Sequence, residues 1–578
     1  MAVEYHIYPP IGIARVGNSP DEFYLGPEQY LGLPFEAKNG TEAPVKTFRD
    51  GSGRMKRQGA RFYVYTFNPD HPESAGKRIQ IGQDDVVNIE WHVHVANKKA
   101  LWYKFEQLQG EHGYKADHPL RNASVTSPAE RQKLIIDPGP VTVSGKNDRK
   151  NMGRSSVQHG YPAIFPPENL LPESIDTLGE ARTDEAGNLI VLGGLGNSGS
   201  DIEPEIKTYA NNDNWWDDIS DGSISATIHL ADGSHVVASQ PAWVIVAPPA
   251  YAPQVPNITT LYDVLYDLAL KEFHFDTRLF DQGHWRRDYI VNFKTEIRPL
   301  LERAGLAQWV CHIPKDAHLF DLNALGNNDS QYDAIRKRIA DLIRRRGQEN
   351  QKSNDKNHTM MPLLCGDNPI TPTLPSEYMV VTDTQQFLLS QWADGKFVAE
   401  DPSRKTSEEA DLTQAVLSNC VGAPFCPGIE ITWIARNPAI YASPFRIRHK
   451  KITDKQLSQS EDLNAGVEPG DLSKRMALPW QADFNECSTQ KIDDAEVYWW
   501  PAQRPMSVTV QTDPPGLTAP PPVDWARGIP SHGDTPGDIH MVSQWKNLGF
   551  IKASLDPFDP AYYEVEREDD AFHPPRHS

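Results

Sequence analysis

The chain has 578 residues, of which 39% are hydrophobic and 23% charged, and its formal net charge is −21. This composition is typical of a globular protein with about two to four structural units and excludes a disordered chain. The net negative charge excludes a surface that binds the phosphates of nucleic acids, because such a surface needs concentrated Lys and Arg.

Membrane spans and a disulfide scaffold are also excluded by pattern. The start, Met1 to Pro10, lacks the basic segment and apolar core of a secretory signal, and no apolar run approaches the roughly 18 residues of a membrane helix. Five cysteines are an odd number for a disulfide framework. We therefore expect a protein of the bacterial cytoplasm, or one exported without a recognisable signal peptide, with no membrane or nucleic-acid partner.

Residues 1–255 are predicted to form a β-rich unit. Apolar and polar residues alternate over Arg61–Phe67 and Val86–Val95, with clusters of Gly, Pro, Asn and Asp between such runs. His92 and His94 would point to the same face of a strand, as in some metal sites. A third ligand is not visible nearby, so we interpret them as two histidines on a half-solvated strand face and expect no metal.

The segment Gly194–Gly199 matches the G-x-G-x-x-G fingerprint of dinucleotide-binding folds and follows the apolar run Leu189–Leu192. That fingerprint requires a helix directly after it, so that the pyrophosphate meets a helix N-terminus. Here the chain continues through polar residues, without an amphipathic pattern until about residue 259. We interpret the segment as a glycine-rich turn.

Residues 256–475 are predicted to form a helix-containing middle unit. Apolar residues recur at helical spacing over Thr260–Lys271, Gln331–Arg346 and Ser407–Asn419. Thr382 begins a capping box that precedes a further helix, which we expect to end at Gly395. The basic residues Arg336–Arg338 and Arg344–Arg346 are interpreted as a solvated helix face.

Residues 476–578 form the predicted C-terminal segment. It is rich in loops, apart from a helix expected over Gly537–Leu548 that buries Trp545. Before this segment, Cys420–Glu430 is predicted to form a turn rich in glycine and proline. Its Cys-x5-Cys spacing is not one that zinc sites use, so we expect both thiols to be buried. The fold class is therefore α+β, with a β-rich N-terminal half, a helix-containing middle and a loop-rich C-terminal region.

The chain lacks the familiar sequence motifs of serine hydrolases, P-loop proteins and zinc proteases. An enzyme of this sequence must therefore use a cofactor that its motifs do not reveal, or make its own. Asp483 stands four residues before Cys487, and Trp545 lies near the C-terminus. Spacing alone does not distinguish a cofactor site from an acid, a thiol and a core indole.

Five blocks in order carry a resemblance to a known family. They are Ile11–Phe23, Trp216–Gly222, Cys420–Glu430, Leu478–Asp483 and Trp499–Pro505. Together they resemble the lysine ε-oxidase and glycine oxidase family, and the likeness extends from the N-terminus to Trp545.

The resemblance implies a cofactor made from the chain itself. Members of that family carry cysteine tryptophylquinone, in which a Cys sulfur is bonded to a Trp ring oxidised to an ortho-quinone. The family places an Asp four residues before the modified Cys, which matches Asp483 and Cys487 and is not met by Cys420 or Cys426. The modified Trp matches Trp545; the competing tryptophans are Trp480, Trp499 and Trp500.

The implied activity is oxidation of an amino acid or other primary amine. The quinone captures the amine and accepts two electrons, and the products are an aldehyde or oxoacid, ammonia and hydrogen peroxide. Asp483 is expected to act as a base. Two alternatives stay open: a dehydrogenase that passes electrons to a carrier, and an inactive binding protein of the same fold.

Further expectations follow from the resemblance. Trp216 and Cys420 are expected to approach the cofactor and influence substrate choice, and the bulk of Trp216 puts specificity for glycine or lysine in doubt. His532 or His540, the histidines nearest to Trp545 in sequence, is a candidate for proton transfer. A flavoprotein partner is expected to assist cofactor formation, with molecular oxygen as co-substrate and a homo-oligomer as the assembly.

Overall fold

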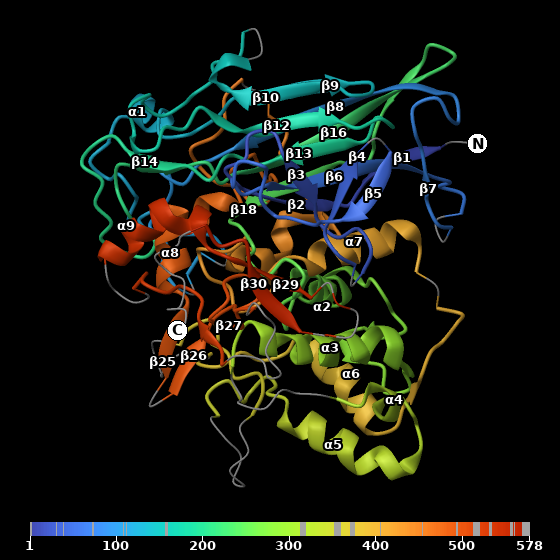
Figure 1. Ribbon diagram of the computed structural model, residues 1–578. Coiled ribbons are helices and arrows are strands. Elements are labelled where there is room, and N and C mark those ends of the chain that lie inside the picture. The colour runs from blue at the N-terminus through green and yellow to red at the C-terminus, as the bar shows by residue number, and fades with distance from the viewer. Residues whose placement is uncertain are drawn as a thin grey trace.

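A computed structural model gives the architecture of the chain (Figure 1). It describes residues 3–568 except 31, 39, 72–73, 108, 111, 157–159, 313–319, 352–359, 370–375, 405, 453–454, 493–494, 512–520, 531–534, 555, 557–558 and 560. The prediction for His532 lies outside these residues.

A large sheet dominates the N-terminal part of the chain. In the described residues its fifteen strands are β1 Glu4–Tyr8, β2 Ile11–Arg15, β3 Phe23–Leu25, β4 Phe35–Lys38, β5 Thr41–Pro44, β6 Arg57–Phe67, β7 Lys77–Arg78, β8 Val86–Ala96, β9 Val141–Ser144, β10 Arg149–Gly153, β12 Thr177–Thr183, β13 Leu189–Leu192, β16 Asp221–Leu230, β17 His235–Val237 and β18 Ala242–Ala247. The central order is β10-β12-β13-β6-β2-β18-β16-β8-β9.

Most neighbours in this sheet are antiparallel, whereas β18 runs parallel to β2 and β3 runs parallel to β6. The strands predicted from alternation are present as β6 and β8. On β8, His92 bonds to the hydroxyls of Thr142 and Thr227, and His94 is buried and bonds to Asp137 at 2.8 Å. Each histidine therefore has polar partners from the chain itself.

A small second sheet joins β11 Leu171–Pro172, β14 Ser198–Ser200 and β15 Trp215–Asp217. The glycine-rich segment leads directly into β14, without a helix, as predicted. The other paired strands are short: β19 Phe280–Asp281 with β20 His284–Trp285, β21 Val291–Asn292 with β22 Phe397–Val398, β23 Tyr441–Ser443 with β24 Arg446–Ile447, β25 Thr489–Ile492 with β26 Ala495–Tyr498, β27 Ser507–Val508 with β28 Val523–Asp524, and β29 Phe550–Ala553 with β30 Tyr562–Val565.

The α-helices in the described residues are α1 Pro128–Gln132, α2 Leu261–Phe273, α3 Arg298–Leu306, α4 Leu322–Leu325, α5 Asp333–Leu342, α6 Asp383–Ala393, α7 Glu408–Ser418, α8 Trp480–Glu486 and α9 Thr535–Gln544. Capping boxes at Thr260 and Thr382 begin α2 and α6, and the predicted α7 is confirmed. None of the helices in the described residues is long and apolar enough to cross a membrane.

The helix predicted over Gln331–Arg346 is shorter than expected. It ends at Leu342 because Ile343 turns to an extended conformation and pairs with Met361. The prediction of a solvated basic face is wrong for Arg336 and Arg344, which are fully buried. Arg336 pairs with Asp333 on the same helix and lies over the ring of Phe397. Spacing along one helix cannot indicate the contact with Phe397, which belongs to another element.

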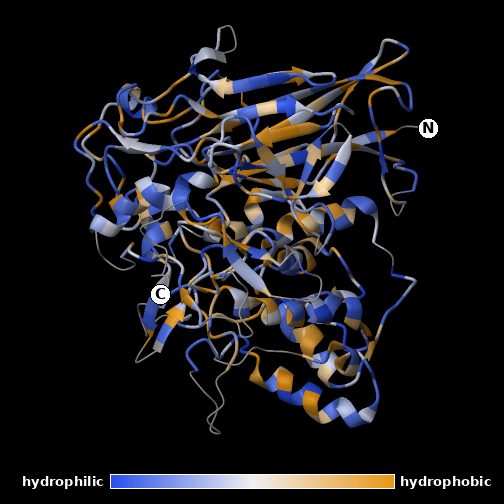
Figure 2. Ribbon diagram, viewed as in Figure 1, coloured by the Kyte–Doolittle hydropathy of each residue, from blue (hydrophilic) through white to orange (hydrophobic). Residues whose placement is uncertain are grey.

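The molecule has the large sheet at one end and α3–α6 at the other, with α8 and α9 beside the sheet near β14 (Figure 1). Figure 2 shows hydrophobic segments along central strands and alternating hydrophobic and hydrophilic segments along α5. The main hydrophobic core includes Val93, Trp433 and Trp545, which come from the three predicted units. The unit boundaries at 255 and 475 stay predictions.

Candidate active site

The helix α8 is anchored at its start by a buried ion pair of the N-terminal part. The backbone N–H of Trp480 donates to Oδ2 of Asp217 at 3.0 Å, and the same oxygen accepts from Nζ of Lys99 at 2.7 Å. Lys99 also donates to the carbonyl of Ala477, just before the helix. The carboxylate of Asp217 therefore satisfies a free N–H at the helix N-terminus.

The end of α8 is held by a second buried cation. Nη1 of Arg504 donates to the carbonyls of Phe484 and Asn485, which are free because the helix ends there. The N–H of Cys487 still donates to the carbonyl of Asp483 at 2.9 Å. Residues four apart on a helix share one face, so Asp483 and Cys487 point the same way.

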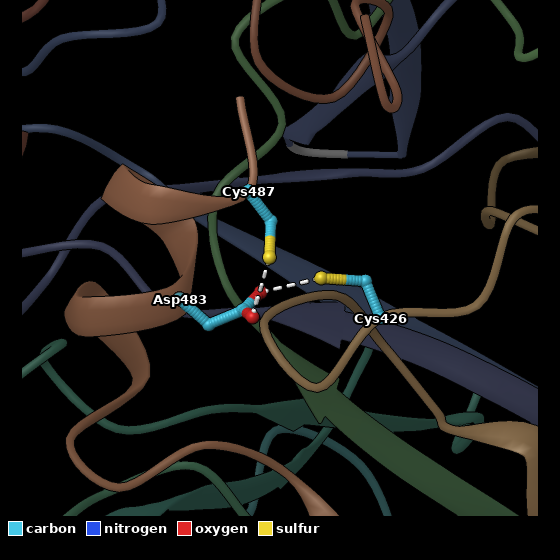
Figure 3. Close-up of side chains that lie close together, drawn as sticks. All are labelled: Cys426, Asp483 and Cys487. Atoms are coloured by element: carbon cyan, nitrogen blue, oxygen red, sulfur yellow. Dashed lines mark hydrogen bonds between the residues drawn. The ribbon is translucent and has the colours of Figure 1, made fainter. Parts of the chain in front are cut away.

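The carboxylate of Asp483 lies between two thiols (Figure 3). Sγ of Cys487 donates to Oδ1 at 2.9 Å, and Sγ of Cys426 donates to Oδ2 at 2.6 Å. All three residues are buried, with Asp483 fully so. Gly428 makes room for this group, because a Cβ at that position would lie 2.2 Å from Oδ2 of Asp483.

Burial controls the protonation of this group. Loss of solvent raises the pKa of Asp483 to about 7, although hydrogen bonds from both thiols and the Gly428 amide act to lower it. Burial likewise raises the pKa of Cys426 to about 12 and that of Cys487 well above its ordinary value. Both sulfurs are therefore protonated at neutral pH, next to an acid that can exchange a proton there.

These three residues are the one group of His, Cys, Asp and Glu in the described part of the chain whose donor atoms lie close enough to share a metal ion. The sulfur–oxygen distances of 2.6 and 2.9 Å are those of hydrogen bonds. A cation would require both thiols to ionise, whereas burial holds them protonated. The arrangement therefore fits a thiol–carboxylate network better than a metal centre.

Trp545 follows α9 directly and opens a short 3-10 turn, Trp545–Asn547. Its side chain is 1% exposed and packs edge-on against Trp480, with ring centroids 5.4 Å apart. The Tyr251 hydroxyl donates to its carbonyl. Its indole Nε1 is buried and has no hydrogen-bond partner in the described part of the chain. The tryptophan is therefore held through its backbone and packing, and its ring atoms are free of polar bonds.

The helices α8 and α9 pack against each other, which places the Cys487 and Trp545 segments in one region. Nδ2 of Asn485 on α8 donates to Oδ1 of Asp538 on α9 at 3.1 Å. Burial, followed by the charge of Glu486, raises the pKa of Asp538 to about 8. A protonated Asp538 avoids repulsion from Glu486, so the contact between the helices is favoured at neutral pH.

Other residues expected in the pocket lie in different places. Trp216 is buried in β15 opposite Gly199. Cys420 is buried beside Glu430, which pairs with Arg15. His540 is exposed on α9. The structure therefore joins Asp483 to Cys487 but shows no hydrogen bond from these three side chains to that carboxylate.

Two residues near Asp483 were not singled out from the sequence. Cys426 contributes the second thiol, although its offset gave no reason to choose it over Cys420. The half-buried Tyr209 lies near the same group: burial, then the neighbouring Cys487, Asp483 and Cys426, raise the pKa of its phenol. The one signal in the sequence was the block Cys420–Glu430, which does not indicate which of its two cysteines contacts Asp483.

A cofactor made from the chain fits these residues. Gly196 leaves space for the indole, because a Cβ there would lie 2.3 Å from Cζ2 and 2.4 Å from Cη2 of Trp545. Asp483 can accept the proton of the Cys487 thiol, to which it is already hydrogen-bonded. A thiol, a base and an indole ring without polar bonds are the groups that joining a sulfur to the ring requires.

Comparison with known sequences assigns most of the chain. Residues 8–246 match the profile described as L-lysine epsilon oxidase N-terminal, and residues 362–505 match the L-lysine epsilon oxidase C-terminal domain. The chain is 32% identical to the L-lysine 6-oxidase of Marinomonas mediterranea, over 98% of this chain and 90% of that protein.

Solved structures agree. The chain superimposes on the crystal structure of the L-Lys epsilon-oxidase from Marinomonas mediterranea with a TM-score of 0.85 at 31% identity, covering 98% of this chain and 95% of that one. The same values hold for the Schiff base intermediate of that enzyme with L-Lys. The α+β architecture and the order of its parts are therefore those of a known oxidase fold.

Proposed function

The chain belongs to the L-lysine epsilon oxidase family, and from this membership we propose that it oxidises an amino acid through a cofactor formed from its own Cys487 and Trp545. Members of the family are quinone enzymes that act on an amino group with oxygen as acceptor, and the chain is such an oxidase. The two alternatives, an electron-carrier dehydrogenase and an inactive binding protein, are not favoured.

One observation carries the assignment of the cofactor residues. The carboxylate of Asp483 accepts a hydrogen bond from Sγ of Cys487 at 2.9 Å, on a helix that packs against the helix preceding Trp545. This supports cysteine tryptophylquinone, because the thiol and the indole belong to one hydrophobic core and the acid bonded to the thiol is fully buried. When formed, that group supplies an electrophilic carbonyl and accepts two electrons.

The remaining chemistry falls to side chains of the chain. We assign to Asp483 the transfer of protons, first from the Cys487 thiol during maturation and then from the substrate carbon that bears nitrogen. A pKa of about 7 suits a base that works near neutral pH. Cys426 donates to the other oxygen of Asp483 and thereby orients its carboxylate. Full burial excludes water from the acid and strengthens these interactions.

The substrate is proposed to be an amino acid with a primary amine, and L-lysine is the first compound to test because the relative that matches acts on it. Tyr209, which is half-buried near Asp483, is our candidate for the entrance. Trp216 and Cys420 remain candidates for substrate choice, and His532 or His540 for proton transfer. Peroxide release over a panel of amino acids, with mass analysis of the product, would distinguish ε- from α-oxidation.

Formation of the cofactor needs a partner. Four hydrogens are removed, from the thiol and three ring carbons, and two oxygen atoms are added; two molecules of oxygen then yield two of water. We propose that a flavoprotein activates this oxygen. We also propose that the mature enzyme is a homo-oligomer, which analytical ultracentrifugation would test.

Intact mass after co-expression with such a flavoprotein tests the cofactor. The wild type should gain about 28 Da by atom counting from the cofactor chemistry, and a peptide map should join Cys487 to Trp545. Asp483→Asn and Cys487→Ser should fold but gain no mass and show no quinone absorbance. Cys311→Ser, which removes a different buried thiol, is the control and should gain mass normally. A cross-link to Cys426, or full mass gain in Cys487→Ser, would reject the assignment.

A further inference from the structure

The turn Gly194–Asn197, between β13 and β14, requires glycine at two positions because other side chains lie directly beside them. A Cβ at Gly194 would lie 2.5 Å from Cγ of Asp218, and a Cβ at Gly196 would lie 2.3 Å from Cζ2 of Trp545. Gly196 also has a φ of +81°, a conformation that favours glycine. The pattern that resembles a nucleotide fingerprint therefore forms a wall against the Trp545 ring.

Asp218 holds this turn from one side. The N–H of Asn197 donates to Oδ2 of Asp218 at 3.0 Å. In return, the N–H of Asp218 donates to the carbonyl of Asn197 at 3.1 Å. Asn197 and Asp218 thus exchange two hydrogen bonds, which hold the turn against a buried side chain.

The helix α8 holds the turn from the other side. The carbonyl of Gly196 accepts from Nε1 of Trp480 at 3.4 Å and from Nε2 of Gln481 at 3.2 Å. Oγ of Ser198 donates to Oε1 of Gln481 at 2.7 Å. The turn is therefore fixed to the helix that carries Asp483 and Cys487, while its Gly196 contacts the ring of Trp545.

One carboxyl oxygen of Asp218 is not used to hold the turn. Among the residues that the structure describes, its Oδ1 is buried without a hydrogen-bond partner, as is Nε1 of Trp545. The neighbouring Lys99 pairs with Asp217 rather than with Asp218. The hydrogen bond that closes the turn accounts for the burial of Oδ2 of Asp218. It does not account for the burial of the second carboxyl oxygen, Oδ1.

We propose that Gly196 and Asp218 are positioning residues for cofactor formation. The turn that they build sets the depth and orientation of the Trp545 ring against α8, and glycine keeps side chains away from the Cζ2–Cη2 bond. An ortho-quinone requires two adjacent ring carbons to take up oxygen, and this bond joins such a pair. The inference rests on the proposed function and names the residues that prepare the ring for it.

Matched glycine variants, co-expressed with the flavoprotein partner, test this role. Gly196→Ala should lower the fraction of chains that gain about 28 Da by roughly tenfold to 100-fold, because displacement of a reacting group by about 1 Å has effects of that size. Gly233→Ala is the control: it has a similar φ of +85° with open space around it, so it carries the backbone strain without the contact. It should be modified like the wild type.

Asp218→Leu provides an arm that keeps a side chain of similar size but removes both acceptor oxygens. It should fold, with a reduced modified fraction and weaker quinone absorbance, because leucine cannot accept the hydrogen bond of the Asn197 amide. Folded protein is isolated by size exclusion before its mass is measured.

The outcomes separate the two proposals. Wild-type yields of modified protein in Gly196→Ala, or an equal loss in Gly233→Ala, would overturn the inference. If Gly196→Ala gives no folded protein, Asp218→Leu decides, and a wild-type modified fraction there overturns the inference. A wild-type chain that stays at its unmodified mass would instead reject the proposed function.

Discussion

At the scale of single residues, Asp483 has the most unusual environment in the site. A carboxylate without a cationic partner is expensive to bury, and here two neutral thiols and an amide are its donors. These bonds only partly offset the loss of water, which is why the pKa of the acid rises to about 7. The residue to which the family resemblance pointed thus has a physical reason to act as a base.

The thiol of Cys426 should tune this acid. Its hydrogen bond lowers the pKa of Asp483, so Cys426→Ala should raise that pKa, by about one pH unit for the loss of one bond to a charged group. The ionisation of the base in a profile of kcat/KM against pH should therefore move to higher pH. Cys311→Ala, at a buried thiol not bonded to Asp483, should leave the profile in place; equal profiles for both variants would show that another group titrates.

At the scale of elements, α8 is short and depends on partners at both ends. Seven residues make few internal hydrogen bonds, so the carboxylate of Asp217 at its start and the guanidinium of Arg504 at its end complete it. Asp217 belongs to the N-terminal part and Arg504 to the C-terminal segment. The position of Cys487 therefore depends on the whole chain having folded.

The ion pair of Lys99 and Asp217 offers a test of this dependence. Lys99→Met leaves a buried carboxylate without its cation and should destabilise the protein by about 3–5 kcal/mol. The double variant Lys99→Met/Asp217→Asn removes both charges and should recover much of that loss. Denaturant unfolding of the three proteins measures the difference; additive losses in the double variant would show that the two side chains do not act as a pair.

At the scale of the whole molecule, the core unites segments from the entire chain and encloses several acids. Burial raises the pKa of Asp221 to about 6, of Asp483 to about 7, and of Asp218 and Asp538 to about 8. Each of these carboxyls ionises near pH 4 in the unfolded chain. At pH values above about 4 and below these raised pKa values, the folded protein binds more protons than the unfolded chain.

Stability should therefore fall as the pH rises from about 4 to about 8, because the unfolded state binds fewer protons over that window. The midpoint of thermal unfolding should be lower at pH 8 than at pH 6. Asp538→Asn removes one of these groups and should make the slope shallower, while Asp232→Asn, at an exposed site, serves as the control. A slope of opposite sign would show that other titrating groups outweigh the buried acids.

Local patterns in the sequence were sufficient for several features. Alternation predicted β6 and β8, helical spacing predicted α2, and a capping box predicted the start of α6. These succeed because strand alternation and helix caps involve residues a few positions apart. The glycine-rich turn was also identified correctly, since the helix that a nucleotide site needs was missing after it.

The sequence by itself also determined the order of the family blocks and the Asp483–Cys487 offset, which one turn of helix converts into a hydrogen bond. Only the tertiary structure decided that Cys426 faces Asp483 and that Gly196 touches Trp545. It also decided that Arg336 is buried. Those contacts join segments far apart in the chain or on different elements, and the side chain that faces inward depends on packing that no local spacing encodes.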